Sequence, residues 1–569
     1  MIIGIDLGTT NSVVTAFIDD KITIIPNALG EFLTPSAVSI DDDGKLLIGR
    51  SALERSITHP HLTATLFKRH MGTDYEYQLG KKTFRPEELS ALVLKSLKDD
   101  AETFLGCSIQ EAVISVPAYF NEQQRNATRN SGELAGLKVE RLLNEPTAAS
   151  IAFGLHNKEI ETKILVLDLG GGTFDVSVLE LFEGVIEVQA TAGDNFLGGE
   201  DFTEELIEYH MVNHTPPLNT ADLTPVEKQA ILRKFEMAKR ELTDHKSITF
   251  NCLIKKDKIE FNVSRHSFEQ ACTPLVSRLK TPIEQALRDS KFDPNELEDV
   301  LLVGGATRMD VINKMVARVF GRFPRKDVNP DLAVGIGAGI QGALKMNEQA
   351  LDDVVLTDVT PFTLGISALQ ESPTGIPVEA FCPIIERNSA IPISRVETFS
   401  TVSSNQKVVL IQVFQGEYRS PNQNIKIGDL NVKLPKGTPA HHPVDVRFTY
   451  DVDGLLEVEV EVSGHEEKRR IVFENSPGRL SKKEISKRFK NLEKLKVHPR
   501  DQLRNRSLLA KAERLYAQKL GLVREEIGQA IDGFRSVLAT QLDHDIRRAY
   551  NDLARFLDNI EKDEYRLEQ

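Results

Sequence analysis

Two short apolar runs in the first half of the chain each end in an acidic, glycine-rich turn. Residues 2–6 (IIGID) lead into a Gly/Thr turn and a second apolar run at 12–17, and the same order returns at 164–168 and 176–181. Apolar runs of this length on either side of a glycine-containing turn predict β-hairpins. Because the pattern occurs twice, we expect two similar lobes within residues 1–350.

Amphipathic segments lie between the two hairpins. Residues 121–135 are one example, because apolar positions follow a capping residue at helical spacing. Each lobe should therefore combine helices with strands, which makes the first half of the chain an α/β unit.

Strand patterns dominate from about 360 to 475. Residues 408–414 form a continuous apolar run typical of a buried strand, whereas 444–450 lead through an Asp-Gly turn into the alternating run 456–462. These strands predict a β-sandwich.

Two further patterns complete the organisation. Residues 351–358 (LDDVVLTD) are a short apolar stretch flanked by acids that fits no helix or strand, so we interpret them as a linker. Ser481 and Glu484 form a capping box, and apolar residues beyond it recur every three or four positions, which predicts a helical tail. The recurring residues are Ile527, Ile531, Phe534, Leu538, Leu542 and Ile546.

Composition narrows the class of protein. A chain of 569 residues exceeds what one hydrophobic core usually organises. No apolar run approaches the roughly 18 residues that a membrane span needs. A net charge of -14 with scattered Lys and Arg disfavours nucleic acid as a partner. The four cysteines are far apart, which fits a reducing compartment, and Met1 runs directly into the first strand, so we expect the cytoplasm.

The repeated Asp and Gly/Thr turn suits nucleotide chemistry. Glycines let backbone N–H groups approach phosphate oxygens, and a carboxylate can hold hydrated Mg²⁺. A single turn of this kind is more often an ordinary hairpin bend, but two copies favour a nucleotide site.

Other phosphate-binding motifs carry less weight. The P-loop pattern does not occur in the sequence. Residues 337–342 match Gly-x-Gly-x-x-Gly, but they lie within a helical pattern and follow no strand, so we interpret them as close helix packing. Residues 303–308 (VGGATR) end a strand with Gly-Gly and an Arg that could approach an adenine or ribose.

Five segments, in order along the chain, resemble signatures of the seventy-kilodalton heat-shock (DnaK-type) chaperone family. They are 5–12 (IDLGTTNS), 116–121 (VPAYFN), 144–149 (NEPTAA), 168–175 (DLGGGTFD) and 197–202 (LGGEDF). The similarity continues through most of the remaining chain up to the tail. The shortened loops and lid are most similar to the specialised bacterial HscC branch.

The resemblance implies a multidomain fold. Residues 1–350 would form an actin-like, two-lobed α/β nucleotide-binding (ATPase) domain, followed by an interdomain linker at 351–358. Residues 359–480 would form a β-sandwich that binds peptide, and 481–569 a short α-helical lid.

The resemblance also implies a site for ATP or ADP, with Mg²⁺ and associated K⁺ ions. Three aspartates, Asp6, Asp168 and Asp175, would organise the cations. The phosphates would be held by Gly8, Thr9, Thr10, Asn11, Gly170, Gly171, Gly172 and Thr173. Other cofactor-binding positions are Gly199, Gly304 and Asp331, and the adenosine pocket would be Glu236, Lys239, Arg240, Thr243, Gly305 and Arg308. Charges at spacing three and four are also typical of any solvated helix face.

Catalysis would depend on Lys68, which matches the family lysine that positions the attacking water, and on Glu145 across the cleft. Asp168 and Thr173 complete the expected catalytic set. Phosphoryl transfer to water needs mainly positioning and charge neutralisation, which these groups supply. Without the family context, Lys68 would be read as a solvated surface charge.

Residues that couple the halves follow from the same resemblance. Pro117 and Arg125 match an interlobe relay, and Arg141 matches an arginine that receives J-domain cochaperones. The linker contributes Val354, Val355, Leu356 and Asp358. A leucine-like side chain of an extended peptide would enter a pocket formed by Phe399, Val402, Val409 and Ile411, with Phe381 and Ile384 nearby. The simpler alternative is that these apolar residues are sandwich core.

Several positions depart from the family pattern. Asn195 replaces a hydroxyl, which puts autophosphorylation there in doubt, and Ala306 stands where Ser is usual. Thr357 replaces an apolar linker residue, so docking of the linker could be weaker. Phe381 and Val402 are bulkier than the usual residues, which predicts a narrower groove and a restricted peptide preference.

The resulting prediction is an ATP-dependent chaperone of the bacterial cytoplasm. It would bind and release extended apolar segments of unfolded or specific clients, with ATP hydrolysis and J-domain cochaperones driving the cycle; the need for an exchange factor stays open. Two alternatives remain. A small-molecule kinase of the actin-like superfamily would lack the β-sandwich, and a nucleotide-gated interaction protein would bind a partner without refolding it.

Overall fold

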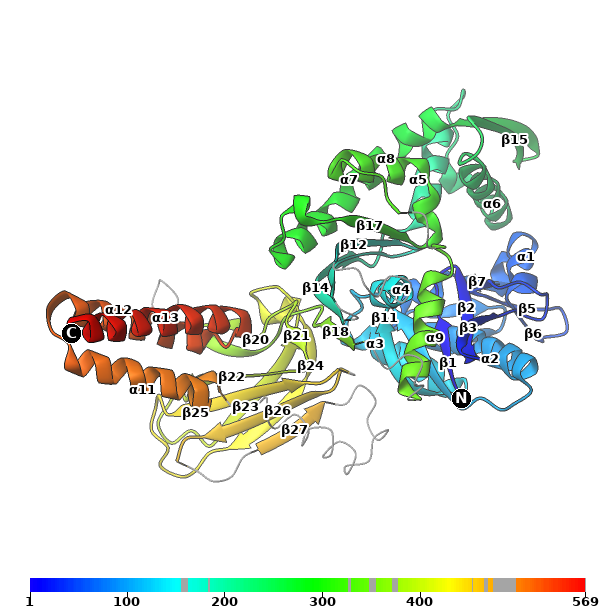
Figure 1. The fold of residues 1–569 in the computed structure, drawn as a ribbon. Helices are drawn as coiled ribbons and strands as arrows, with labels where there is room; N and C mark the ends of the chain where they lie inside the picture. The colour runs from blue at the N-terminus through cyan, green and yellow to red at the C-terminus, as the bar shows by residue number, and fades with distance from the viewer. Residues whose placement is uncertain are drawn as a thin grey trace. The chain divides into compact units, whose positions relative to one another are not determined.

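The computed structural model describes residues 1–154, 162–182, 185–325, 329–346, 355–370, 377–452, 454–464, 469–473 and 498–567. This part of the chain forms two compact units (Figure 1). Unit 1 comprises residues 1–363 with 386–391, and unit 2 comprises 364–385 with 392–569. Within the described ranges, none of the helices is both long enough and apolar enough to traverse a bilayer.

The first lobe of unit 1 is built on a mixed sheet with the order β11-β10-β1-β2-β3. Its strands are β1 (Ile2–Asp6), β2 (Asn11–Ile18), β3 (Lys21–Ile25), β10 (Glu111–Val116) and β11 (Lys138–Asn144). Strands β1 and β2 run antiparallel, with Gly4 opposite Thr15, so the first predicted hairpin is confirmed. The predicted helix at 121–135 is also confirmed as α3 (Glu122–Leu134), whose N-cap Asn121 accepts a hydrogen bond from the Gln124 backbone.

The second lobe repeats this arrangement in the order β17-β12-β13-β14-β18-β21. Its strands are β12 (Thr162–Leu169), β13 (Phe174–Phe182), β14 (Val185–Asp194), β17 (Asp299–Val303), β18 (Val355–Val359) and β21 (Ala390–Ile391). In the β12–β13 hairpin Asp168 lies directly opposite Asp175. The second predicted hairpin is therefore confirmed, and it places two acidic side chains at one end of the sheet.

Smaller elements complete the two lobes. The short sheets are β6-β5-β7, β8-β9 and β15-β16, formed by β5 (Ala37–Ile40), β6 (Leu46–Ile48), β7 (Thr63–Thr65), β8 (Tyr77–Leu79), β9 (Lys82–Phe84), β15 (Ser247–Ile254) and β16 (Asp257–Ser264). The surrounding helices are α1 (Arg50–Thr58), α2 (Pro86–Leu105), α5 (Gly199–Val212), α6 (Pro225–Glu241), α7 (Arg265–Ser290) and α8 (Asp310–Phe320).

Helices α4 (Glu145–Gly154) and α9 (Ala333–Lys345) share one apolar core with both large sheets (Figure 1). The glycine motif predicted to serve helix packing lies in α9. A Cβ on Gly337 would lie only 1.9 Å from the Ala148 carbonyl oxygen of α4. The interpretation as helix packing is therefore confirmed, because only glycine lets the two helices approach this closely.

The linker forms more structure than the sequence indicated. Residues 351–354 lie outside the described residues, but β18 pairs in parallel with β14 through Leu356 opposite Ile186 and Thr357 opposite Glu187. The expectation that the whole linker would be irregular is wrong for β18. Three apolar residues between acidic ones carry too weak a pattern to reveal a strand whose partner is distant in sequence.

Unit 2 contains the predicted β-sandwich. Its two sheets have the orders β20-β19-β23-β24 and β22-β25-β26-β27. The strands are β19 (Leu364–Gln370), β20 (Val378–Ile385), β22 (Ile393–Ser400), β23 (Val408–Gln415), β24 (Ile425–Lys433), β25 (Pro443–Tyr450), β26 (Leu456–Val462) and β27 (Arg469–Phe473). One expectation is wrong: Val408 and Leu410 of β23 are exposed rather than buried, because only one face of this strand packs into the sandwich.

The helical tail is formed by α11 (Leu503–Gln518), α12 (Gly521–Thr540) and α13 (Asp543–Leu567). The predicted apolar stripe lies mainly on α12 and belongs to the core of this helical bundle, except for Leu542, which is exposed because it lies beyond the end of α12. Gln541, in a left-handed conformation, ends α12, and its side-chain amide bonds both the backbone N and O of Val396 in β22. The capping box at Ser481 lies outside the described residues.

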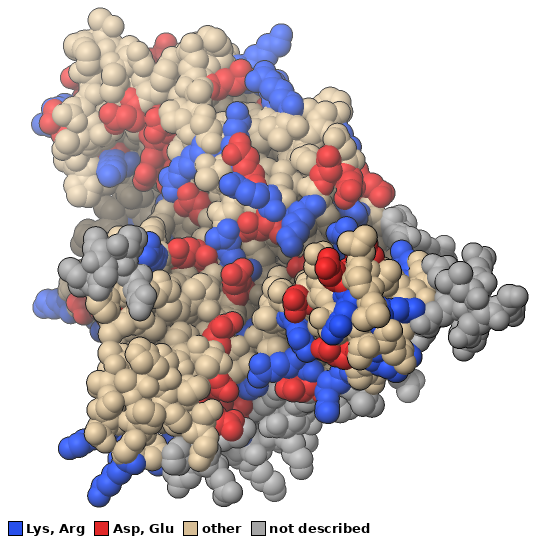
Figure 2. Space-filling model, turned by 90° about the vertical axis from the view of Figure 1, so that its left-hand side faces the viewer, with Lys and Arg blue, Asp and Glu red and all other residues tan. Residues whose placement is uncertain are grey.

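On the face in Figure 2, basic side chains are interspersed with acidic ones.

Candidate functional site

A cavity of about 330 Å³ opens between the two lobes of unit 1. This volume lies at the lower end of the range typical of ligand pockets, roughly 300–1,000 Å³. Most of the predicted nucleotide-site residues line it. They are Asp6, Gly8, Thr9, Thr10, Asn11, Lys68, Glu145, Asp168, Gly170, Gly171, Thr173, Gly199, Glu236, Lys239, Arg240, Thr243, Gly304, Gly305, Arg308 and Asp331.

Two predicted residues lie behind the cavity wall rather than in it. Asp175 is buried, and its Oδ1 accepts a hydrogen bond of 3.1 Å from the Tyr119 backbone. Gly172 packs against Thr9 and Arg69. The cavity also includes residues that sequence reasoning did not single out for the site, namely Leu33, Glu200, Met309, Pro330 and Val334.

The turns of the two hairpins meet across the cavity. A Cβ on Gly171 would lie 1.8 Å from Thr10 Oγ1, so the turn at 170–173 packs directly against the Thr10 side chain of the turn at 8–11. Thr10 Oγ1 is buried without a hydrogen-bond partner. Two glycine turns that face one cavity, with a free hydroxyl between them, fit a bound phosphate chain.

Lys68 is buried beside this point rather than exposed as a surface charge. It lies in a short 3₁₀ helix, Phe67–His70, and is only 2% exposed. Its Nζ donates to Glu145 Oε1 at 2.6 Å. Buried charges need a partner, and here the partner comes from the start of α4. The pair holds a cation and a carboxylate at the cavity wall, as catalysis by positioning requires.

The carboxylates at this end of the cavity repel one another in the absence of a cation. Burial, together with the Glu145 carboxylate, raises the pKa of Asp6 to about 7. Burial likewise raises the pKa of Asp175 to about 7, and burial together with the neighbouring acids raises the pKa of Asp168 well above its usual range. Such a cluster favours a bound divalent cation.

The geometry fits Mg²⁺ held largely through water. Among the described residues, no three His, Cys, Asp or Glu side chains lie close enough to bind a metal ion directly. One carboxylate oxygen each of Asp168 and Asp175 is buried without a hydrogen-bond partner. Mg²⁺ usually keeps several waters and binds through one or two carboxylates plus phosphate oxygens. The free oxygens suit that arrangement.

We expect the nucleotide-free chain to lose stability as pH rises from 5 to 8. Asp6 has an ordinary pKa of 3.8 and a folded pKa of about 7, so its contribution to stability is full below pH 4 and is lost as pH rises through 7. Calorimetry should show that Asp6→Asn raises the unfolding temperature at pH 8 by about 2 °C or more, with less change at pH 5. The exposed Asp43→Asn is the control, and equal effects of both variants at pH 8 would contradict this assignment.

Helices α5 and α6 contribute a second group of cavity residues. Thr224 caps α6 with Pro225 at its first position, which fixes where the helix begins. The Glu236 carboxylate accepts from Thr203 at 2.6 Å and from Arg240 at 2.7 Å. Although burial raises its pKa, Lys239 and Arg240 outweigh this, and the pKa of Glu236 is lowered.

Lys239 is not part of a solvated helix face. It is 6% exposed, and its Nζ donates to the Gly199 carbonyl at 2.6 Å. Burial and Glu236 raise the pKa of nearby Glu200 to about 7. On the other wall, Arg308 pairs with Asp331 at 2.6 Å. This network of charges and hydroxyls can hydrogen-bond a polar ring system and sugar hydroxyls.

The predicted relay residues lie between the cavity and the linker. Arg125 donates to the Phe120 carbonyl and, at 2.6 Å, to Asn144 Oδ1. Asn144 in turn donates to Asp358 Oδ2 of β18 at 2.9 Å. Two other predicted residues flank this chain of contacts. Pro117 accepts from the Phe120 backbone, and Arg141 donates to Gln341.

Two linker residues and Asn195 lie elsewhere. Val354 lies outside the described residues, and for Val355 the structure gives only its backbone place in β18, opposite Val185. Asn195, in place of the family hydroxyl, donates to the Tyr119 carbonyl at 2.9 Å. The Asn195 amide therefore joins the two lobes.

The predicted peptide-binding residues all lie in unit 2. Phe381, Ile384 and Ile411 are buried, as sandwich core would be. Phe399 and Val409 are partly exposed. Val402 is 61% exposed, which core residues are not. The set therefore combines core and accessible positions.

Comparisons with known proteins identify the family. A model described as Hsp70 protein matches residues 2–569. Proteins named "Chaperone protein DnaK" from Thermotoga petrophila, Thermotoga maritima and Thermotoga neapolitana are each 41% identical over 504 residues, which cover 85% of this chain and 82% of theirs. With two nucleotide-type turns facing one cleft and a β-sandwich with helices after the linker, the chain therefore belongs to the Hsp70 family.

Proposed function

We propose that the cleft of unit 1 binds ATP and that its hydrolysis controls how unit 2 holds a polypeptide. The chain is an ATP-dependent chaperone and an ATPase, as its family membership establishes. The observation that supports this particular cleft is the meeting of both glycine turns beside the buried Lys68–Glu145 pair.

Within the cleft, the turns at 8–11 and 170–173 hold the phosphates, and Lys68 with Glu145 positions the attacking water. Thr173 and Asp168 line the same cavity. Mg²⁺, and K⁺ in our proposal, would neutralise charge on the phosphates when bound. Asp6, Asp168 and Asp175 are the carboxylates that would hold these cations through water. The network of Glu236, Lys239, Arg240 and Arg308 receives the adenosine.

Adjacent residues support coupling between this site and the linker. Glu145 pairs with Lys68 in the cavity, and its neighbour Asn144 bonds Asp358 in β18. A second contact runs through Tyr119, whose backbone N–H bonds Asp175 and whose ring lies 4.5 Å from that of Phe362. A change around the γ-phosphate can thus reach the linker through contacts already in place.

Asp358→Ala should uncouple peptide from hydrolysis. The variant removes the acceptor for Asn144 and weakens the fit of β18 against the first lobe, while the cavity residues stay in place. We expect the basal single-turnover rate of hydrolysis to stay within about threefold of wild type. Most of the acceleration by peptide should be lost, which corresponds to losing a coupling free energy of about 1–3 kcal/mol between the two sites. The exposed Asp43→Ala is the control, and full acceleration in Asp358→Ala would contradict the coupling role.

In unit 2 we propose that the peptide groove is formed by Phe381, Ile384, Phe399, Val402, Val409 and Ile411. An extended peptide would use strand-like backbone hydrogen bonds and one apolar anchor. The exposure of Val402 supports access to this surface. Bulky Phe381 and Val402 favour a narrow preference among clients.

The partners and boundaries complete the proposal. Arg141 and the linker would receive a J-domain cochaperone, with Pro117 and Arg125 as the interlobe relay. We keep the boundaries 1–350, 351–358, 359–480 and 481–569, the HscC branch and the bacterial cytoplasm as proposals. The kinase alternative required that no β-sandwich follow the linker, and unit 2 contains one.

Single-turnover ATP hydrolysis with and without extended apolar peptides tests the function. We expect at least one peptide in a panel to accelerate hydrolysis. No acceleration by any peptide would count against general chaperone action. In that case, binding of a native partner protein that unfolded peptide cannot displace would identify the chain as a nucleotide-gated interaction protein.

A further inference from the structure

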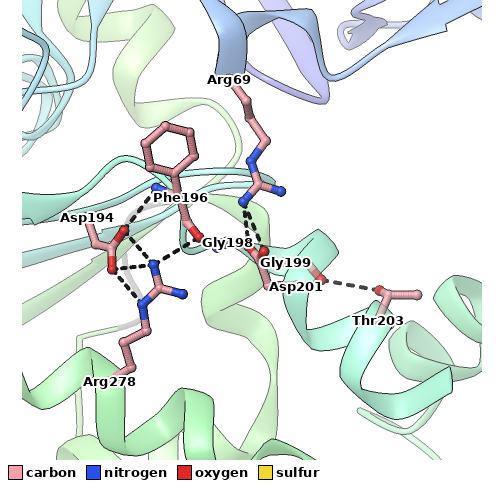
Figure 3. A network of polar contacts seen from close by, with 8 residues as sticks. All are labelled: Arg69, Asp194, Phe196, Gly198, Gly199, Asp201, Thr203 and Arg278. Carbon is pink, nitrogen blue, oxygen red and sulfur yellow. Dashed lines mark hydrogen bonds and ion pairs between the residues drawn. The ribbon is translucent and has the colours of Figure 1, made fainter. Parts of the chain in front are cut away.

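An ion pair crosses from the first lobe to the second at the edge of the cleft. Arg69, the residue after Lys68, donates through Nη2 to both carboxylate oxygens of Asp201, at 2.9 and 3.1 Å (Figure 3). The two side chains are only 15% and 18% exposed. A partly buried contact of a guanidinium with both oxygens of a carboxylate is stronger than an ordinary surface pair.

Asp201 is fixed to the loop that faces the phosphate site. Its Oδ2 accepts from the Gly198 backbone at 2.7 Å, which caps α5. The first residues of α5 are in turn bonded to the second glycine turn, because Gly199 N donates to Gly170 O and Glu200 N to Gly171 O, both at 2.9 Å. Asp201 is therefore connected through backbone hydrogen bonds to the turn that lines the cavity.

Arg69 is fixed on the other side. Its chain neighbour Lys68 is buried against Glu145, and its methylene groups lie over Gly172. A Cβ on Gly172 would lie 2.9 Å from both Cγ and Cδ of Arg69. The arginine thus lies across the turn from the first lobe before it meets Asp201.

We propose that Arg69 and Asp201 form an interlobe clasp that keeps the cleft closed over bound nucleotide. They are positioning residues: neither touches the reacting atoms, and both act by holding the first lobe against the turn at 170–173 of the second lobe. A nucleotide enclosed by two lobes leaves when the lobes separate, so the clasp slows its release. This inference rests on the proposed nucleotide site.

A neighbouring pair provides a matched control. Arg278 of α7 binds both carboxylate oxygens of Asp194 at the end of β14, through Nε at 2.7 Å and Nη2 at 2.9 Å (Figure 3). Both residues belong to the second lobe, so this pair cannot hold the lobes together. A different ion pair, Arg233 with Glu54, also joins the lobes but is more exposed, so loss of the clasp should speed release without abolishing binding.

The test measures dissociation of MgADP from the full-length chain, using a fluorescent ADP analogue displaced by excess ATP. Arg69→Met keeps the apolar stem over Gly172, and Asp201→Asn keeps an oxygen for the Gly198 N–H. We expect each variant to release MgADP about tenfold faster, equivalent to about 1.4 kcal/mol. The double variant should be no faster than either single one, because the two residues act through one contact. Arg69→Lys should release MgADP more slowly than Arg69→Met, because lysine keeps a positive charge beside Asp201.

Other measurements separate the clasp from a general loss of structure. Hydrolysis of ATP that is already bound should change less than twofold, and calorimetry should show folded variants. Arg278→Met and Asp194→Asn should release MgADP at the wild-type rate. Asp201→Asn provides the same test if Arg69→Met fails to fold.

Two results would overturn the inference. Wild-type release rates in both clasp variants, or additive effects in the double variant, would contradict the clasp while leaving the nucleotide site intact. A wild-type chain that bound no MgADP would instead contradict the proposed site, and the clasp with it.

Discussion

Lys68→Ala is expected to stop ATP hydrolysis while leaving ATP bound. Lys68 supplies a buried cation 2.6 Å from Glu145 at the point where both glycine turns face the cavity. Loss of one such preorganised group typically slows the chemical step by about 10²–10³-fold. Most of the contacts proposed for the nucleotide come from other residues, so its binding should change far less.

Single-turnover hydrolysis and equilibrium binding of ATP measure these two quantities separately. The exposed Lys95→Ala is the control for loss of a positive charge. Lys68→Ala leaves the Glu145 carboxylate buried without its cation, which should lower the stability of unit 1. A double variant that also carries Glu145→Gln should regain this stability but should still not hydrolyse ATP. Normal turnover in Lys68→Ala would overturn the assignment.

Gly337→Ala is expected to destabilise unit 1 by at least about 3 kcal/mol. The added Cβ would meet the Ala148 carbonyl at 1.9 Å, and both atoms belong to helices that share a core with the two sheets. Overpacking of a tightly packed contact costs about 1–3 kcal/mol, and a clash with backbone cannot be relieved by a rotamer change. In calorimetry, the unfolding transition of unit 1 is the one whose midpoint temperature rises when MgADP is added.

Gly342 in the same helix is the matched control for that substitution. Its Cβ would lie 3.3 Å from the nearest backbone atom, so Ala there should cost much less. In an open helical position Ala is favoured over Gly by about 1 kcal/mol. Equal destabilisation by both variants would contradict helix packing as the reason for the glycine motif.

Local patterns in the sequence were sufficient to predict both hairpins and the two glycine turns that face the cavity. Each hairpin is built from one apolar run, one glycine turn and a second run, so its pairing needs no distant partner. The helix cap at Asn121 is predictable for the same reason. Lys68 and the α6 charges required the family resemblance, since their burial depends on residues far along the chain.

Features made by distant partners escaped prediction. The strand β18 forms because β14, about 170 residues earlier, offers it an edge. Arg69 and Asp201 are separated by 132 positions and appear in the sequence as two ordinary surface charges. The exposure of Val408 and Leu410 likewise depends on which face of β23 the second sheet covers. Tertiary contacts determine all three.

We propose that the nucleotide in unit 1 sets how firmly unit 2 holds a polypeptide. The most direct measurement loads the chain with a fluorescent apolar peptide and follows its dissociation into excess unlabelled peptide, once with MgADP and once with MgATP. We expect the peptide to dissociate faster with MgATP, by roughly 5- to 150-fold for a typical coupling energy. Equal rates with the two nucleotides would contradict it.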